Sequence, residues 1–133
     1  MKIITKLFVF TVLVIVIFGF SSCQEEFAVR YVVEGGEHRQ VDATVVFINH
    51  RDEMATMRVV SLPWRREFTT NSKTLSLSVH FQHPITSEYT ARIFVNGIER
   101  ASQNEIQTSQ TGTQLLRVNY NIPSRLERLF RAY

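Results

Sequence analysis

The chain has 133 residues, of which 15 are basic, 12 are acidic and only one is a cysteine, and its formal net charge is +3. The basic residues do not form a cluster with interleaved aromatic residues, which argues against nucleic-acid binding. A single cysteine excludes a disulfide within the chain, so a folded domain must rely on its apolar core.

The first 22 residues have the composition of a secretory signal peptide. Lys2 and Lys6 form a short basic start, and residues 7–20 form an apolar run interrupted only by a threonine and a glycine. Two serines follow, and this order is typical of an export signal. The run of 14 residues is shorter than the roughly 20 that a membrane-spanning helix needs, so a retained transmembrane anchor is the weaker interpretation.

The cysteine at the end of this signal predicts a lipid anchor. The stretch Phe20-Ser21-Ser22-Cys23 resembles the lipobox of bacterial lipoproteins, with phenylalanine where leucine is usual. The resemblance implies cleavage before Cys23 and attachment of diacylglycerol to its thiol, with palmitate as a marker of the modification. The alternative is an ordinary signal peptide that ends beside a chance cysteine.

Residues 23–26 would then form the lipidated cysteine and a polar tether, Gln24-Glu25-Glu26. The two glutamates resemble the acidic stretch that directs some lipoproteins of the Bacteroides group to the cell surface. A solvated tether without an address function is the alternative. We therefore expect a lipid-anchored protein of the cell envelope, at the outer membrane, on its periplasmic or its surface face.

From residue 27 onward, apolar and polar side chains alternate with period two, which is typical of half-buried strands. In the clearest case, Leu75, Leu77, Val79 and Phe81 alternate with threonine, serine and histidine. The pattern predicts about seven strands, at residues 27–33, 41–47, 57–62, 74–81, 89–95, 98–101 and 116–122.

Turn signals separate these expected strands. Gly35-Gly36 ends the first, and the polar residues 49–53 predict a hairpin turn. Asn96-Gly97 predicts a two-residue type I′ turn, because both central residues of that turn need a positive φ. Short strands at this spacing predict an all-β sandwich or barrel over residues 27–123.

The last ten residues, 124–133, predict a short amphipathic helix after Pro123. Ser124 and Glu127 have the spacing of a capping box. The apolar residues that share one helical face are Leu126, Leu129, Phe130 and Tyr133, with arginines around them. The helix either closes one end of the domain or presents a basic amphipathic patch to lipid headgroups or a partner, and we expect the first.

The sequence contains no recognisable catalytic arrangement, so we expect neither enzymatic activity nor a cofactor. The only cysteine is assigned to lipid, and the motifs of serine hydrolases, nucleotide binding and phosphate loops are absent. His80 and His83 form an H-x-x-H pair, but residues three apart on a strand point to opposite faces. Two surface histidines beside a turn are expected here rather than a metal site.

Trp64 is the only tryptophan and lies beside two basic residues, Arg65 and Arg66. If the segment is extended, Trp64 and Phe68 share a face. One interpretation is that Trp64 anchors the core or its edge, since buried tryptophan contributes strongly to packing. The other is that Trp64, Arg65 and Arg66 form a contact patch for a ligand.

The same segment resembles a known family. Leu62-Pro63-Trp64 followed by Phe68 looks like the P-W-x-x-x-F segment of the MmpS family of small mycobacterial membrane proteins. Four further segments resemble motifs of that family in the same order, namely residues 29–35, 41–45, 75–78 and 91–97. The resemblance covers roughly residues 29 to 120.

This resemblance implies an immunoglobulin-like β-sandwich of about seven strands tethered to a membrane. It also implies an accessory partner of large lipid and siderophore exporters, and it carries no catalytic residues. The chain departs from the family in two ways: it has a lipidation signal in place of the usual N-terminal transmembrane helix, and it lacks the cysteine pair of many members.

Three functions remain from the sequence. The favoured one is a non-enzymatic accessory subunit of a cell-envelope complex, partnered by the membrane through Cys23 and by an envelope membrane protein. The alternative is a surface-exposed module that binds glycans or peptides through Trp64, Arg65 and Arg66. The third, an enzyme or metal protein that uses His80 and His83, has the least support.

Overall fold

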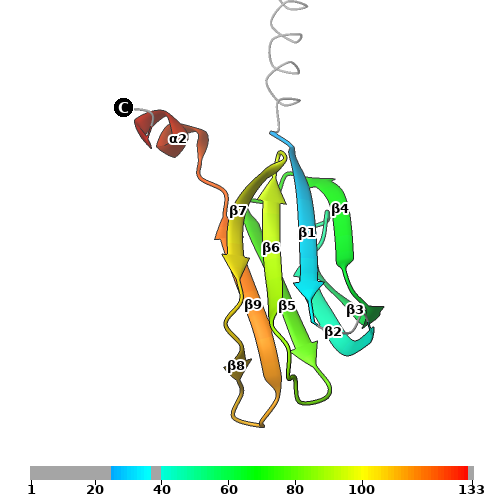
Figure 1. Ribbon diagram of the computed structural model, residues 1–133. Helices are drawn as coiled ribbons and strands as arrows, with labels where there is room; N and C mark the ends of the chain where they lie inside the picture. Colours follow the sequence, from blue (N-terminus) through cyan, green and yellow to red (C-terminus); the bar gives the residue numbers. More distant parts are fainter. Residues whose placement is uncertain (1–24, 37–39, 132–133) are drawn as a thin grey trace, which may run out of the picture.

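The computed structural model describes residues 25–36 and 40–131 and consists of two antiparallel β-sheets packed face to face (Figure 1). The nine strands are β1 (Phe27–Gly35), β2 (Gln40–Ile48), β3 (Met54–Ser61), β4 (Trp64–Thr70), β5 (Thr74–Phe81), β6 (Tyr89–Val95), β7 (Ile98–Gln103), β8 (Gln107–Thr108) and β9 (Gln114–Asn121). We call the sheet with the order β4-β1-β6-β7 sheet A, and the sheet with the order β3-β2-β5-β9-β8 sheet B. The expected all-β sandwich is confirmed.

The core lies between the sheets because each strand turns its apolar alternate residues inward. In β1, for example, Phe27, Val29, Tyr31 and Val33 are buried while the residues between them are not. The largest fully buried side chains come from both sheets and include Tyr31, Phe47, Leu75, Leu77, Ile93 and Leu116. Each such side chain contributes about 1.5–3 kcal/mol of transfer free energy.

Tyr31 joins the sheets through both packing and a hydrogen bond. Its ring lies 5.8 Å from the ring of Phe47 and 5.3 Å from that of Phe68, measured between centroids. Its hydroxyl donates to the backbone oxygen of Ile48 at 2.8 Å. Burial raises the pKa of Tyr31 well above its usual range, outweighing the opposite effect of a hydrogen bond with the backbone of Ser76. The phenol is therefore neutral and able to donate throughout the physiological range.

Two strands exceed the seven that the alternation predicts. β4 begins at Trp64 after the cis peptide bond between Leu62 and Pro63. The alternation of apolar and polar residues in β4 cannot be recognised in the sequence, because a charged residue, Arg66, occupies the core-facing position between Trp64 and Phe68. β8 has only two residues, too few to produce a pattern.

The predicted turns are confirmed. Asn96 and Gly97 have φ values of 51° and 80°, as a type I′ turn requires. Asn96 also joins this turn to β1, since its backbone nitrogen donates to the Ala28 oxygen at 2.7 Å and its side-chain oxygen accepts from the Ala28 nitrogen at 3.0 Å. The turn at 49–53 closes with a hydrogen bond of 2.9 Å from the Asn49 nitrogen to the Glu53 oxygen.

The C-terminal helix α2 spans Arg125–Arg131 and follows β9 after a short connection (Figure 1). The side-chain oxygen of Ser124 accepts from the backbone nitrogen of Glu127 at 3.2 Å, which confirms the predicted cap. Leu129 and Phe130 of α2 are exposed, so these two apolar side chains add nothing to the core.

Of the glycines within residues 25–36 and 40–131, Gly35 should be the least tolerant of alanine. Its φ is +118°, and an added Cβ would overlap the carbonyl oxygen of Glu88, which accepts a hydrogen bond of 2.8 Å from the nitrogen of Gly36. Gly97 has a φ of +80°, but no atom lies within 4 Å of its added Cβ, so it isolates the cost of the backbone conformation.

We expect Gly97→Ala to lower the free energy of unfolding by about 1 kcal/mol. Gly35→Ala should lower it by about 2–4 kcal/mol, because steric overlap adds to the conformational cost. Urea denaturation of both variants measures the difference. If both variants lowered the free energy of unfolding equally, the backbone at Glu88, just before β6, would be able to move away from the added Cβ at no cost.

Candidate functional site

The predicted lipidation site, Cys23, lies outside the described residues, as does the signal peptide before it. The first described residue, Glu25, follows Cys23 by two positions, and its carboxylate oxygens accept from Nη2 of Arg128 at 2.6 and 2.7 Å. No helix within residues 25–36 and 40–131 is long and apolar enough to cross a membrane.

β4 separates the three residues that were expected to form one contact patch. Trp64, Arg66 and Phe68 pair with core residues of β1 and lie on the side that faces sheet B. Arg65 lies on the outer face of sheet A, where its guanidinium is 3.8 Å from the carboxylate of Glu67. A patch that includes both arginines on one surface is therefore absent from this strand.

Trp64 is half-buried at the edge of the core. Its ring centroid lies 5.6 Å from that of Phe47, and the guanidinium of Arg66 lies 5.7 Å from the centre of the same Phe47 ring. Trp64 thus packs as an edge anchor, and Arg66 lies beside the same Phe47 ring. The exposed guanidinium of Arg66 is the polar part of this arrangement that solvent or a partner reaches.

The edges of β3 and β4 lie on the same side of the sandwich (Figure 1). We call these two strands the β3–β4 flank. β3 is an edge of sheet B, β4 is an edge of sheet A, and only Leu62 and Pro63 separate them in the chain. β3 exposes two apolar side chains, Met54 (63%) and Val60 (61%), with Met57 at the rim. Edge strands offer unpaired backbone donors and acceptors, so this flank combines apolar surface with free hydrogen-bonding groups.

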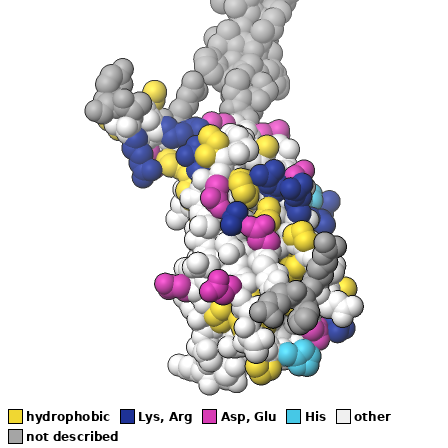
Figure 2. Space-filling view, in the orientation of Figure 1, with side chains coloured by type: hydrophobic (Ala, Val, Ile, Leu, Met, Phe, Trp, Pro, Cys, Tyr) yellow, Lys and Arg dark blue, Asp and Glu magenta, His cyan; other side chains and the backbone are white. Residues whose placement is uncertain are grey.

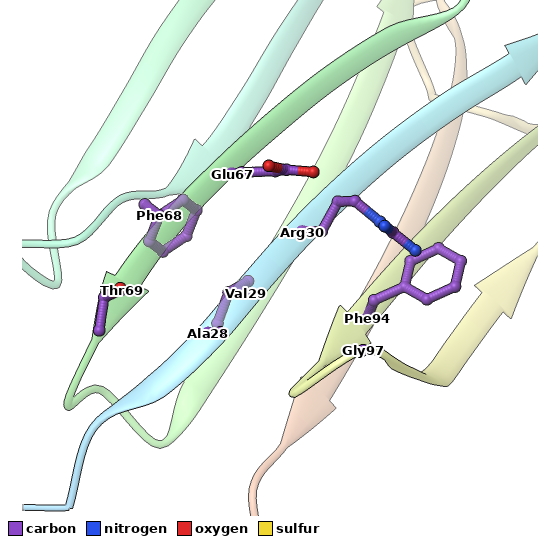
Figure 3. A pocket seen from close by; sticks show the side chains of 8 residues that line it. All are labelled: Ala28, Val29, Arg30, Glu67, Phe68, Thr69, Phe94 and Gly97. Carbon is purple, nitrogen blue, oxygen red and sulfur yellow. The ribbon is translucent and has the colours of Figure 1, made fainter.

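A second feature is a shallow groove of about 370 Å³ on the outer face of sheet A (Figure 3). Ala28 forms its floor, because its small side chain lies between larger ones on the neighbouring strands. Arg30 extends toward Phe94, and its guanidinium lies 4.1 Å from the centre of that ring. Glu67 and Thr69 of β4 form the opposite wall. Within the described part of the chain, the buried Nε of Arg30 has no hydrogen-bond partner.

Ion pairs lie on the same outer face of sheet A as this groove. Arg92 lies 3.0 Å from Glu34 through Nη2 and 3.3 Å from Glu99 through Nε. These groups are partly exposed, so each pair contributes at most about 1 kcal/mol. Figure 2 shows hydrophobic, basic and acidic side chains close together on the upper part of this face. The face is thus charged but nearly balanced, and the Arg30–Phe94 contact is its main feature for recognition.

His80 and His83 do not come together. His80 points to the outer face of sheet B, opposite Thr44 and Leu115 in the register. Nε2 of His83 lies 3.5 Å from a carboxylate oxygen of Asp42, and this imidazole is largely exposed. Among residues 25–36 and 40–131, no group of three or more potential metal ligands is present.

Sequence reasoning missed the groove because it depends on strand pairing. Arg30 and Phe94 are directly opposite in the β1–β6 register although 64 positions separate them. Alternation does place both on an outward face. Nothing in the pattern of either strand says that they are neighbours.

No protein-family model matches the chain, and no curated protein has a similar sequence. The resemblance to the MmpS family therefore stays a prediction.

Proposed function

We propose that this protein is a lipid-anchored, non-enzymatic accessory subunit of a cell-envelope complex that binds a membrane-protein partner through the β3–β4 flank. The predicted lipidation at Cys23 and the short tether support the membrane location. The observation that carries the proposal is that the edge strands of both sheets lie on one side of the sandwich, where β3 exposes Met54 and Val60.

The flank suits a protein better than a small ligand. Edge strands recognise extended segments by main-chain hydrogen bonds, and side-chain contacts then supply specificity. Met54, Met57 and Val60 provide apolar contacts along β3, and methionine adapts to irregular partner surfaces. Arg58 of β3 is already paired with Asp42, since Nε lies 3.3 Å from its carboxylate oxygen. The exposed Arg66 of β4 favours a partner segment with an acidic residue.

Site-specific photo-crosslinking in intact cells tests this proposal. We expect a photoreactive side chain at Val60 to capture one discrete envelope membrane protein. The same group at Gln107 should not, because β8 is the opposite edge of the same sheet. Mass spectrometry identifies what is captured.

Charged substitutions on the flank should remove the capture and so provide a matching loss-of-binding test. The double variant Met54→Glu, Val60→Glu should abolish capture while changing the free energy of unfolding by about 0.5 kcal/mol or less per site, since both side chains are exposed. Equal capture from both edges, or capture that survives the double variant, would contradict a partner at this flank.

The groove favours a second candidate function, a surface module for glycans or peptides that carry a carboxylate. Arg30 offers a guanidinium held against the Phe94 ring, and the part of this half-buried ring that lines the groove suits the apolar side of a sugar or peptide. The groove is near the lower limit of the roughly 300–1,000 Å³ typical of ligand pockets. This function therefore ranks below the accessory role.

An array of acidic glycans and peptides tests the second candidate. Any binding should fall about tenfold or more in Arg30→Gln and in Phe94→Ala, because the charged contact and its aromatic support are lost. Arg65→Gln is the control, since Arg65 lies on the same outer face but outside the groove. Binding that survives the first two changes would place the ligand elsewhere.

A further inference from the structure

One end of the molecule brings together the first described residues, the Asn96–Gly97 turn and α2 (Figure 1). Arg128 of α2 holds the carboxylate of Glu25 with two short contacts, and its guanidinium lies 5.9 Å from the centre of the Phe27 ring. α2 is therefore joined to the beginning of the domain rather than to its far end.

A cleft of about 200 Å³ separates α2 from the sandwich, and three arginines line it: Arg100 of β7 and Arg128 and Arg131 of α2. Glu25 balances Arg128. In the described part of the chain, no carboxylate lies within ion-pair distance of Arg100 or Arg131. Figure 2 shows basic side chains gathered where the helix meets the sandwich. The cleft is thus positively charged and fits a phosphate group.

Apolar side chains are exposed at the same end. Phe130 is 79% exposed, Leu129 57% and Ile98, beside the Asn96–Gly97 turn, 53%. A helix with exposed apolar residues and arginines beside them is the composition of an element that lies in a membrane interface. Seven residues are too few to form a stable helix alone, so α2 depends on its contact with Glu25 for its position.

The distance to the predicted anchor identifies the occupant of this surface. Cys23 precedes Glu25 by two residues, which span at most about 7 Å. A lipid on Cys23 would hold the arginines and the exposed apolar residues near the headgroups of its own membrane. A surface of anionic phospholipid matches both the charge of the cleft and the apolar residues beside it.

We propose that this end of the domain is a second membrane contact, in which Leu129 and Phe130 enter the boundary between headgroups and acyl chains and Arg100 and Arg131 bind lipid phosphates. The contact rests on the proposed lipid anchor and extends it. It fixes the orientation of the sandwich, with α2 against the membrane and the β8–β9 hairpin pointing away.

Labelling by a photoreactive phospholipid tests this contact. The full chain, purified from membranes with its lipid, is reconstituted in vesicles of phosphatidylcholine, with or without phosphatidylglycerol. We expect label on residues 125–131 to exceed label on residues 107–113 at least tenfold, and to increase with phosphatidylglycerol.

Two pairs of substitutions separate the contributions. Phosphatidylglycerol should increase the label on residues 125–131. Arg100→Gln with Arg131→Gln should reduce this increase by about fivefold for each arginine removed. Arg58→Gln with Arg65→Gln removes the same charge elsewhere and should leave it unchanged. Leu129→Ser with Phe130→Ser should lower the label on α2 in both kinds of vesicle.

The mass of the N-terminal peptide reports the anchor separately. Lipid on Cys23 without label on α2 would overturn the second contact and leave the anchor intact. Label on α2 with an unmodified Cys23 would support the contact and remove the anchor. Label spread equally over both ends, or unaffected by the arginines and by phosphatidylglycerol, would also overturn it.

Discussion

Cys23→Ala should abolish incorporation of palmitate and remove the protein from the outer-membrane fraction. A diacylglycerol thioether and its acyl chains supply about 0.8 kcal/mol for each buried CH₂ group. The seven-residue helix α2 cannot replace that affinity, because its exposed apolar surface consists of a few side chains. Metabolic labelling with palmitate, followed by separation of the membranes, measures both effects.

Ser22→Ala is the matched control for this experiment. It keeps a small side chain next to the cleavage site and should leave palmitate incorporation and location unchanged. A Cys23→Ala protein that remains in the outer membrane at its normal amount would show that the association does not depend on the lipid. The accessory role would then need a direct protein contact to hold it at the membrane.

The fold was predictable wherever one face of a strand is buried and the other is exposed to solvent. β5 shows why: Leu75, Leu77 and Val79 are all buried between the sheets. Burial selects apolar residues at every second position, so the strand can be predicted directly from the sequence. β4 carries no such pattern, because Arg66 extends from a core-facing position over the Phe47 ring to solvent.

The candidate sites were less predictable because they depend on register. Arg65 and Arg66 are neighbours in sequence and lie on opposite faces, whereas Arg30 and Phe94 are distant in sequence and touch. Alternation within a strand gives a residue's face but not its cross-strand neighbour. A contact surface assembled from several strands therefore leaves little trace in any one of them.

The two surfaces that we propose for binding do not compete. The β3–β4 flank runs along one side of the sandwich, and the α2 end is where the chain would meet its anchor (Figure 1). A domain held at that end keeps its flank roughly parallel to the membrane normal. In that orientation, β3 and β4 would face the part of the proposed partner that extends out of the membrane.

Ile93→Ala should be among the most destabilising single changes in the domain. Ile93 is fully buried (0% exposed) on β6, opposite Tyr31 of β1 and Ala101 of β7. The change removes apolar contacts and leaves a cavity, at a cost of about 2–5 kcal/mol. Small domains have only about 5–15 kcal/mol of stability, and this one has no disulfide to limit its unfolded state.

Ile98→Ala is the control, since it makes the same chemical change on the adjacent strand at a largely exposed position. It should alter the free energy of unfolding by about 0.5 kcal/mol or less. Ile93→Val should lie between the two, at about 0.5–1.5 kcal/mol, because it removes a single methylene. Urea denaturation of the three variants gives the series. If Ile93→Ala and Ile98→Ala lowered the free energy of unfolding equally, burial of Ile93 in the core would not be what stabilises sheet A against sheet B.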